Sequence, residues 1–179
     1  MYKVIDISDK QLIQLKSIIN DSKPPVGQHL ETIKAAPGIG NNKSTQFDSS
    51  LLTLIPLGLT NNIKLLEWLE IFTGISSKYI TNIHLNDMKE GAYFNPHYDN
   101  YHIKVSDTYT FLLEEPKQGG DFILDGRTMT CDKNKVVIFN GGKYLHGVSK
   151  VKKGTRKSFI VFYNQPIDKE SKLLLWVYW

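Results

Sequence analysis

Short runs of alternating hydrophobicity are the feature of this sequence that most limits its fold. After residue 78 the chain enters strand-like runs, of which the first is YITNIHLNDM, with Tyr79, Ile83 and Leu85 on one face. Later runs are TYTFLL, DFIL, VVIF and SFIVFY, and the turn sequences PKQGG, DGR, NGG and KKGT punctuate them. Short strands at this spacing are typical of an all-β sandwich or barrel. The pattern therefore predicts a mainly β fold.

The other face of the run YITNIHLNDM carries polar side chains, namely Asn82, His84 and Asn86, followed by Met88. We expect this face to be solvated. The alternative is that these groups line a cavity and orient a small polar substrate.

Two helices are expected ahead of the strands. Ser8 and Gln11 have the spacing of a capping box. The apolar stripes that follow at helical period are Leu12, Leu15, Ile18 and Ile19, then Ile63, Leu66, Leu69 and Phe72, with Gly74 as the second stop. Between them, residues 21–50 are rich in Pro, Gly, Asn and Ser, which predicts a long loop and raises the question of a lid.

Length and composition fit one globular domain. A chain of 179 residues with 41% hydrophobic and 22% charged residues can bury a sizeable core, which excludes a disordered or fibrous protein. We expect a single domain over 1–179: a helical support at 1–77, a β core at 78–165 and a C-terminal tail at 166–179.

Charge, cysteine content and hydropathy restrict the partners. A net charge of +4 falls short of the dense basic surface of a dedicated nucleic-acid binder. Cys131 is the one cysteine, so no intrachain disulfide can form and a reducing compartment is expected. The longest apolar run, LLLWVYW, is shorter than the ~20 residues that span a bilayer. We expect a cytoplasmic protein without nucleic-acid or membrane partners; the oligomeric state stays open.

Three residues have the chemistry of a metal site. His97 and Asp99 are two apart, so on a strand they point to the same side. Alone this pair is a weak signal, but His146 downstream supplies a second imidazole. Two histidines and one carboxylate form the facial triad of non-haem Fe(II) sites, and they also suit catalytic zinc. The triad alone leaves the metal undecided.

Arg156 favours iron. It lies ten residues after His146, beyond VKKGT, which we interpret as a tight turn that brings the chain back beside the strand of His146. Arg156, Ser158 and Ile160 then share one face of the returning strand. A guanidinium there suits the far carboxylate of an acid that chelates the metal and supplies electrons for O₂ activation.

Together these residues resemble a known family. The HxD pair in KEGAYFNPHYD, the GGDF turn and LHGVSKVKKGTRKSF are similar to the Fe(II)/2-oxoglutarate-dependent dioxygenases, most closely the prolyl 4-hydroxylase-like branch. The resemblance implies a double-stranded β-helix, or jelly roll, with flanking helices. It implies iron bound by His97, Asp99 and His146, and 2-oxoglutarate whose distal carboxylate is bound by Arg156 and Ser158. O₂ would be the oxidant; whether ascorbate serves as a reductant is left open.

The same resemblance has consequences for the reaction and departures in the site. Asp99 favours hydroxylation, because halogenating relatives have a small residue at this position. The branch often has a tyrosine for the 2-oxoglutarate carboxylate where this chain has Leu112 or Leu113; we assign nearby Tyr109 to the co-substrate site. Met88 and Phe94 also stand where tyrosines are usual.

The resemblance therefore predicts a hydroxylase that releases succinate and CO₂. Its substrate would be a prolyl or other amino-acid residue in a peptide, or a free amino acid or small metabolite. Two alternatives remain. One is an oxidative nucleic-acid demethylase, which needs an aromatic and basic base-flipping platform. The other is a non-catalytic jelly-roll protein that binds or senses a metal.

Overall fold

The computed structural model describes residues 2–21, 52–56, 62–99, 107–129 and 132–164. Most of the expected loop at 21–50, the expected tail at 166–179 and Cys131 lie outside the described residues.

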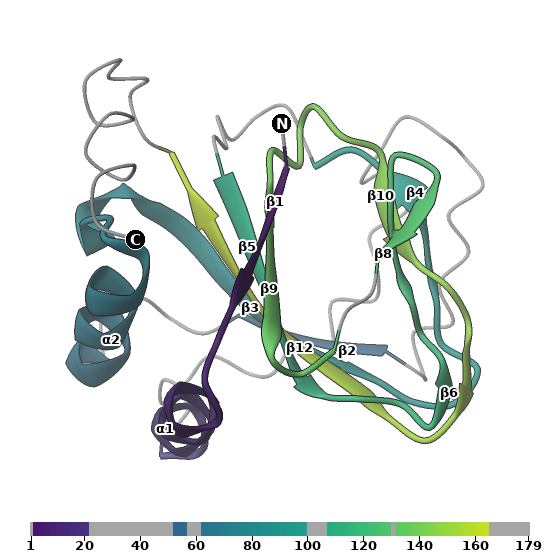
Figure 1. The fold of residues 1–179 in the computed structure, drawn as a ribbon, viewed down its shortest axis with the longest axis horizontal. Coiled ribbons are helices and arrows are strands. Elements are labelled where there is room, and N and C mark those ends of the chain that lie inside the picture. The colour runs from purple at the N-terminus through teal and green to yellow at the C-terminus, as the bar shows by residue number, and fades with distance from the viewer. Residues whose placement is uncertain (1, 22–51, 57–61, 100–106, 130–131, 165–179) are drawn as a thin grey trace.

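Two antiparallel sheets face each other and form the jelly roll that the family resemblance implies (Figure 1). The larger sheet has the order β1 (Lys3–Asp6), β9 (Lys135–Phe139), β5 (Asp107–Glu114), β12 (Arg156–Tyr163), β3 (Ile80–Met88) and β2 (Leu52–Pro56). The smaller has the order β4 (Phe94–His97), β10 (His146–Val148), β7 (Phe122–Leu124) and β8 (Arg127–Met129). A separate pair joins β11 (Val151–Lys153) to β6 (Gln118–Gly119). The mainly β prediction is confirmed.

Both expected helices form, and they lie on the outer side of the larger sheet (Figure 1). In α1 (Asp9–Asn20), Ser8 and Gln11 make both hydrogen bonds of the capping box. Helix α2 (Ile63–Thr73) ends at Gly74, whose φ of 69° is accessible to glycine at little cost. A short 3₁₀ helix (Ser77–Tyr79) follows. Neither described helix is long and apolar enough to cross a bilayer.

A hydrophobic cluster joins the helices to the larger sheet. Its members include Leu15 of α1, Trp68 and Leu69 of α2, and Phe111 and Phe159 of the sheet. The expected stripe of α2 is only partly correct: Ile63 is 68% exposed, and Leu65 and Trp68 are buried instead. The register of α2 on the sheet, which its sequence does not encode locally, decides which side is covered.

A second cluster fills the space between the two sheets. It contains Met88 and Phe139 from the larger sheet and Phe122, Leu124 and Val148 from the smaller one. Strand β3 contributes to both clusters, since Ile83 and Leu85 pack toward the helices while Met88 packs between the sheets.

The polar face of β3 therefore points between the sheets, and the expectation that it is solvated is wrong. Asn86 is only 5% exposed and Met88 is fully buried. His84 is partly buried, and its ring meets the Phe162 ring edge-on with centroids 5.1 Å apart. The second sheet covers a face that the sequence presents as hydrophilic.

The turn before Arg156 takes the chain from the β11–β6 pair into the larger sheet. Strand β11 pairs with β6, and Gly154 in the turn has a φ of 87°. Strand β12 then pairs with β3 and β5 in the larger sheet. The expected return of β12 beside the strand of His146 is thus corrected: Arg156 belongs to the sheet that faces β10.

Candidate active site

His97 and His146 are brought together by strand pairing. His97 is the last residue of β4 and His146 the first of β10, and the two are direct partners in the antiparallel register. Their ring centroids lie 4.4 Å apart. The His146 ring also packs on Phe139 at 4.8 Å, so the larger sheet supports it from across the interior. Two imidazoles from distant parts of the sequence therefore share one place.

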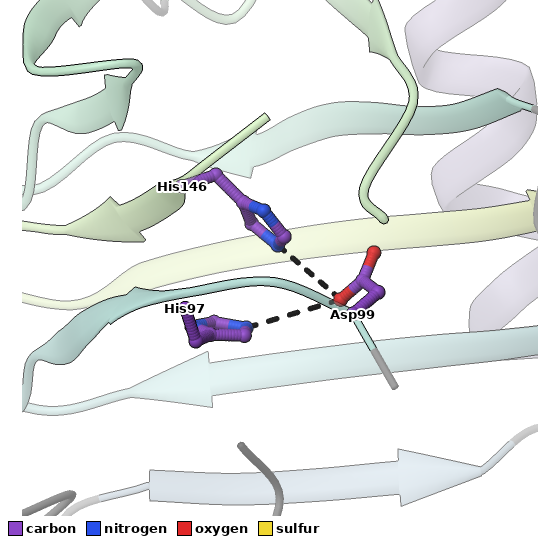
Figure 2. A group of neighbouring side chains, drawn as sticks. All are labelled: His97, Asp99 and His146. Atoms are coloured by element: carbon purple, nitrogen blue, oxygen red, sulfur yellow. Dashed lines mark ion pairs between the residues drawn. The ribbon is translucent and has the colours of Figure 1, made fainter. Parts of the chain in front are cut away.

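Asp99 completes the group just beyond the end of β4. Its backbone N–H donates to the Gly141 carbonyl at 3.0 Å, which fixes the chain there. Its Oδ1 lies 3.3 Å from His146 Nε2 and 3.9 Å from His97 Nε2, as Figure 2 shows. Ligand atoms of all three residues lie within 4.8 Å of one another. The structure brings together the three residues that the sequence selects as metal ligands.

Backbone carbonyls orient both imidazoles. His97 Nδ1 lies 2.8 Å from the Asn95 carbonyl, and His146 Nδ1 lies 3.0 Å from the Tyr144 carbonyl. A carbonyl accepts only from an N–H, so a neutral ring held this way has its lone pair on Nε2. Two such lone pairs then face the Asp99 carboxylate, an arrangement that a cation between them would stabilise. The donor set fits a divalent metal ion bound on one side.

The charge states suit metal binding. Burial lowers the pKa of His97 and the His146 ring lowers it further, against the opposing effects of the Asn95 carbonyl and Asp99. Burial acts to raise the pKa of Asp99, but hydrogen bonding and charge interactions with His146, His97 and His84 outweigh it and lower the pKa. At neutral pH, Asp99 is therefore a carboxylate and His97 a neutral imidazole, the forms that bind metal.

Gly141 gives the Asp99 carboxylate its space. A Cβ at Gly141 would lie 1.7 Å from Asp99 Oδ2, closer than any real contact. Asp99 Oδ2 is buried and has no hydrogen-bond partner within the described part of the chain. In the sequence, Gly141 belongs to the NGG turn signal, and its place beside a candidate metal ligand depends on a contact that no local pattern reveals.

Arg156 and Ser158 lie on the interior face of β12. Arg156 is 1% exposed, and its Nη1 donates to Ser158 Oγ at 2.9 Å. Gly120 packs close to the Arg156 stem, since a Cβ there would lie 3.3 Å from Arg156 Cδ. A guanidinium is almost never buried this deeply without anionic or polar company, so the site suits a carboxylate.

Tyr109 is not brought to this place, which corrects its assignment to the co-substrate site. It packs in the helix-side cluster, with its ring edge-on to Tyr163 at 5.3 Å. Side chains alternate along β5, so Thr108, Thr110 and Leu112 point to the interior while Tyr109 and Phe111 point to the helices.

The family follows from this geometry together with one comparison. Residues 83–164, which include the three candidate ligands, Arg156 and Ser158, match the family model described as the 2OG-Fe(II) oxygenase superfamily. Residues 83–164 form a 2OG-Fe(II) oxygenase domain. The chain is thus a 2-oxoglutarate-dependent dioxygenase, and this domain implies Fe(II), 2-oxoglutarate and O₂.

Solved structures resemble this oxygenase along most of its length. A viral collagen prolyl hydroxylase from Paramecium bursaria Chlorella virus 1, in complex with 2OG, is 16% identical, with a TM-score of 0.57, covering 90% of this chain and 94% of the other. A Pseudomonas putida prolyl-4-hydroxylase is 13% identical, with a TM-score of 0.56 and 92% coverage of both chains.

A Trichoplax adhaerens prolyl hydroxylase, in complex with a hypoxia inducible factor peptide fragment, is 14% identical. Its TM-score is 0.59, and the match covers 97% of this oxygenase and 86% of the other chain. No curated protein sequence matches. At these identities the structural likeness establishes the shared jelly-roll fold.

Proposed function

We propose that this oxygenase is a hydroxylase that inserts one oxygen atom into a substrate C–H bond. The balanced reaction converts 2-oxoglutarate, O₂ and R–H into succinate, CO₂ and R–OH. The observation that most supports it is the convergence of two imidazoles and a carboxylate within 4.8 Å, in an interior that also holds buried Arg156.

His97, Asp99 and His146 would hold the iron. Three ligands on one side leave the opposite coordination positions open to other molecules. The Asn95 and Tyr144 carbonyls would keep each Nε2 available to the metal, and the Gly141 carbonyl anchors Asp99. Bound iron and 2-oxoglutarate together supply the oxidising chemistry of the family.

Arg156 and Ser158 would bind the distal carboxylate of 2-oxoglutarate. The interior position of Arg156 lets a charge-assisted hydrogen bond form away from water, where it is stronger than at the surface. Ser158 holds the guanidinium through Nη1 and so fixes its direction. A co-substrate bound this way is oriented with its keto-acid end toward the metal ligands.

We propose an amino-acid unit as the substrate: a prolyl or other residue in a peptide, or a free amino acid or small metabolite. The likeness to prolyl hydroxylases supports the peptide form. The inward polar face of β3 supports a small polar molecule. One hydrophobic cluster joins the helices to the larger sheet and a second joins the two sheets, which supports a single domain.

The nucleic-acid alternative has less support. The basic run of residues 150–157 combines exposed lysines at β11 with Arg156, which is buried and belongs to the interior. This arrangement fits a solvated turn next to the site.

Succinate formation tests the proposal. The protein is loaded with Fe(II) without oxygen, then given 2-oxoglutarate, O₂ and separate pools of prolyl peptides, free amino acids and methylated oligonucleotides. We expect substrate-dependent succinate and a mass gain of one oxygen atom in one of the first two pools. Formaldehyde release from the oligonucleotides would favour the demethylase, and failure of the metal-loaded protein to bind 2-oxoglutarate would contradict any oxygenase reaction here.

A further inference from the structure

Asn86 is a buried polar residue that the metal site and the Arg156–Ser158 pair leave unexplained. It lies on β3, is 5% exposed, and points between the sheets with Met88. Its Oδ1 is buried and has no hydrogen-bond partner among the described residues. Leaving a buried amide oxygen without a partner is costly, so such groups are usually met by a ligand or water.

The register places Asn86 beside the proposed carboxylate site. Asn86 is the direct cross-strand partner of Ser158, and Arg156 is the partner of Met88. Directly opposite residues of an antiparallel pair have Cβ atoms about 4.5–5.5 Å apart. Asn86, Ser158 and Leu112 are neighbours across three adjacent strands. Because Arg156 Nη1 donates to Ser158 Oγ, the guanidinium lies next to this row of three residues.

Leu112, the third residue of this row, is apolar. On its other side Ser158 is partnered by Leu112 of β5, whose side chain offers no hydrogen bond. Asn86 is thus the neighbour that can supply a further donor, since the NH₂ of its amide can take the place of Oδ1 by rotation about Cβ–Cγ.

We infer that Asn86 donates a hydrogen bond to the distal carboxylate of 2-oxoglutarate, beside Arg156 and Ser158. This inference rests on the proposed function. Asn86 thereby makes the site selective for 2-oxo acids that carry a second carboxylate. This hydrogen bond explains why a polar residue occupies the inner face of β3.

Two co-substrates separate a direct contact from a general structural effect. 2-Oxopentanoate keeps the keto-acid end and the chain length of 2-oxoglutarate but lacks the distal carboxylate. Binding of each acid to the Zn(II)-loaded protein is measured by titration calorimetry, which does not depend on turnover. We expect Asn86→Ala to weaken 2-oxoglutarate binding about ten-fold, as for a lost hydrogen bond to a charged group, and to leave 2-oxopentanoate binding unchanged.

Asn86→Leu is a second variant of similar volume that removes both polar atoms of the amide and guards against a packing defect from the smaller alanine. Asn86→Asp should weaken 2-oxoglutarate binding further, because it adds a like charge next to the distal carboxylate.

Thr108→Val is the matched control. Thr108 is 1% exposed, lies on the same inner face, and its Oγ1 also has no partner among the described residues. Its β12 partner is Phe162, four residues from Ser158 and therefore roughly 13 Å away along the strand. The preference for 2-oxoglutarate over 2-oxopentanoate should be unchanged in this variant.

Equal effects of Asn86→Ala on both acids, or no effect on either, would overturn the assignment of Asn86. In that case Arg156-dependent binding of 2-oxoglutarate by the unmodified protein would still support the proposed function. If the unmodified, metal-loaded protein bound no 2-oxoglutarate, the proposed function would fail first and this inference with it.

Discussion

His97 and His146 are direct partners in the antiparallel pairing of β4 with β10, with ring centroids 4.4 Å apart. The register shifts immediately after this pair, between His146 and Val148. The candidate metal site is therefore built on the end of a strand pair, and anything that separates the two strands should separate the proposed ligands.

Gly147 allows this close approach. A Cβ at Gly147 would lie 2.7 Å from the Phe94 carbonyl oxygen and 3.0 Å from the Pro96 nitrogen, both backbone atoms. Gly147→Ala should force the strands apart at a cost of about 1–3 kcal/mol, which lowers Tm by roughly 5 °C. It should also weaken metal binding. A thermal melt and a metal titration that both match the unmodified protein would contradict this role.

Removing an imidazole should remove the metal. His97→Ala or His146→Ala is expected to lower Mn(II) affinity by more than about 100-fold. Removing only the hydrogen-bond partner of a metal-binding residue already lowers metal affinity by roughly 10–100-fold. Calorimetric titration with Mn(II), a redox-stable substitute for Fe(II), measures this.

His84→Gln is the control for the metal ligands, because His84 affects the Asp99 pKa but is not one of the three clustered residues. An affinity close to that of the unmodified protein is expected. A loss as large as that of His97→Ala would place His84 among the ligands.

Gly141→Ala tests the space beside Asp99. The added Cβ would occupy the position of Asp99 Oδ2, so the carboxylate must turn away and metal affinity should fall at least about ten-fold. Gly142→Ala is a close control, because among the described residues a Cβ there meets only Asn140 Oδ1, at 3.5 Å. Similar metal affinities for the two alanine variants would show that Asp99 adapts without loss.

Arg156→Ala should weaken 2-oxoglutarate binding while leaving metal binding in place. A charge-assisted hydrogen bond contributes about 1.5–3 kcal/mol, which corresponds to roughly 10–150-fold in affinity. Titration of the Zn(II)-loaded protein with 2-oxoglutarate measures this loss of affinity.

Lys157→Ala is the adjacent control, since Lys157 pairs with Glu114 at 3.0 Å on the partly exposed side. Equal losses for both variants would point to a nonspecific charge effect.

Ser8→Ala should affect stability alone. It removes the capping box of α1, which costs about 1 kcal/mol and lowers Tm by about 2–4 °C. Helix α1 packs on the outer side of the larger sheet, away from the metal ligands, so Mn(II) affinity should not change. A shifted affinity would reveal coupling between the helices and the site.

The local features of the fold were open to prediction. The capping box at Ser8 and the helix stop at Gly74 depend on residues a few positions apart, and both form as expected. Alternation identified the strands because a strand with one buried face needs a period of two. The alternation correctly gave β3 an apolar face and a polar face. It could not show that the second sheet covers the polar face.

The positions of side chains in the interior were harder to predict from the sequence. The strand of Tyr109 was predictable, yet its side chain points to the helices, because the parity of β5 against β12 is set by strand pairing. Gly141 and Asn86 acquire their roles only from neighbours far along the chain: Asp99 for Gly141, Ser158 for Asn86.

By itself the sequence determined the chemistry available, namely two imidazoles, one carboxylate and one guanidinium in a chain of short strands. Only the tertiary structure decided that these groups meet, because the β11–β6 pair carries the chain across to the larger sheet before Arg156. The chemistry of an imidazole, carboxylate or guanidinium is a property of a single residue. Bringing these groups together requires two sheets to pack face to face. That packing is a balance of burial over the whole domain, which no short stretch of residues contains.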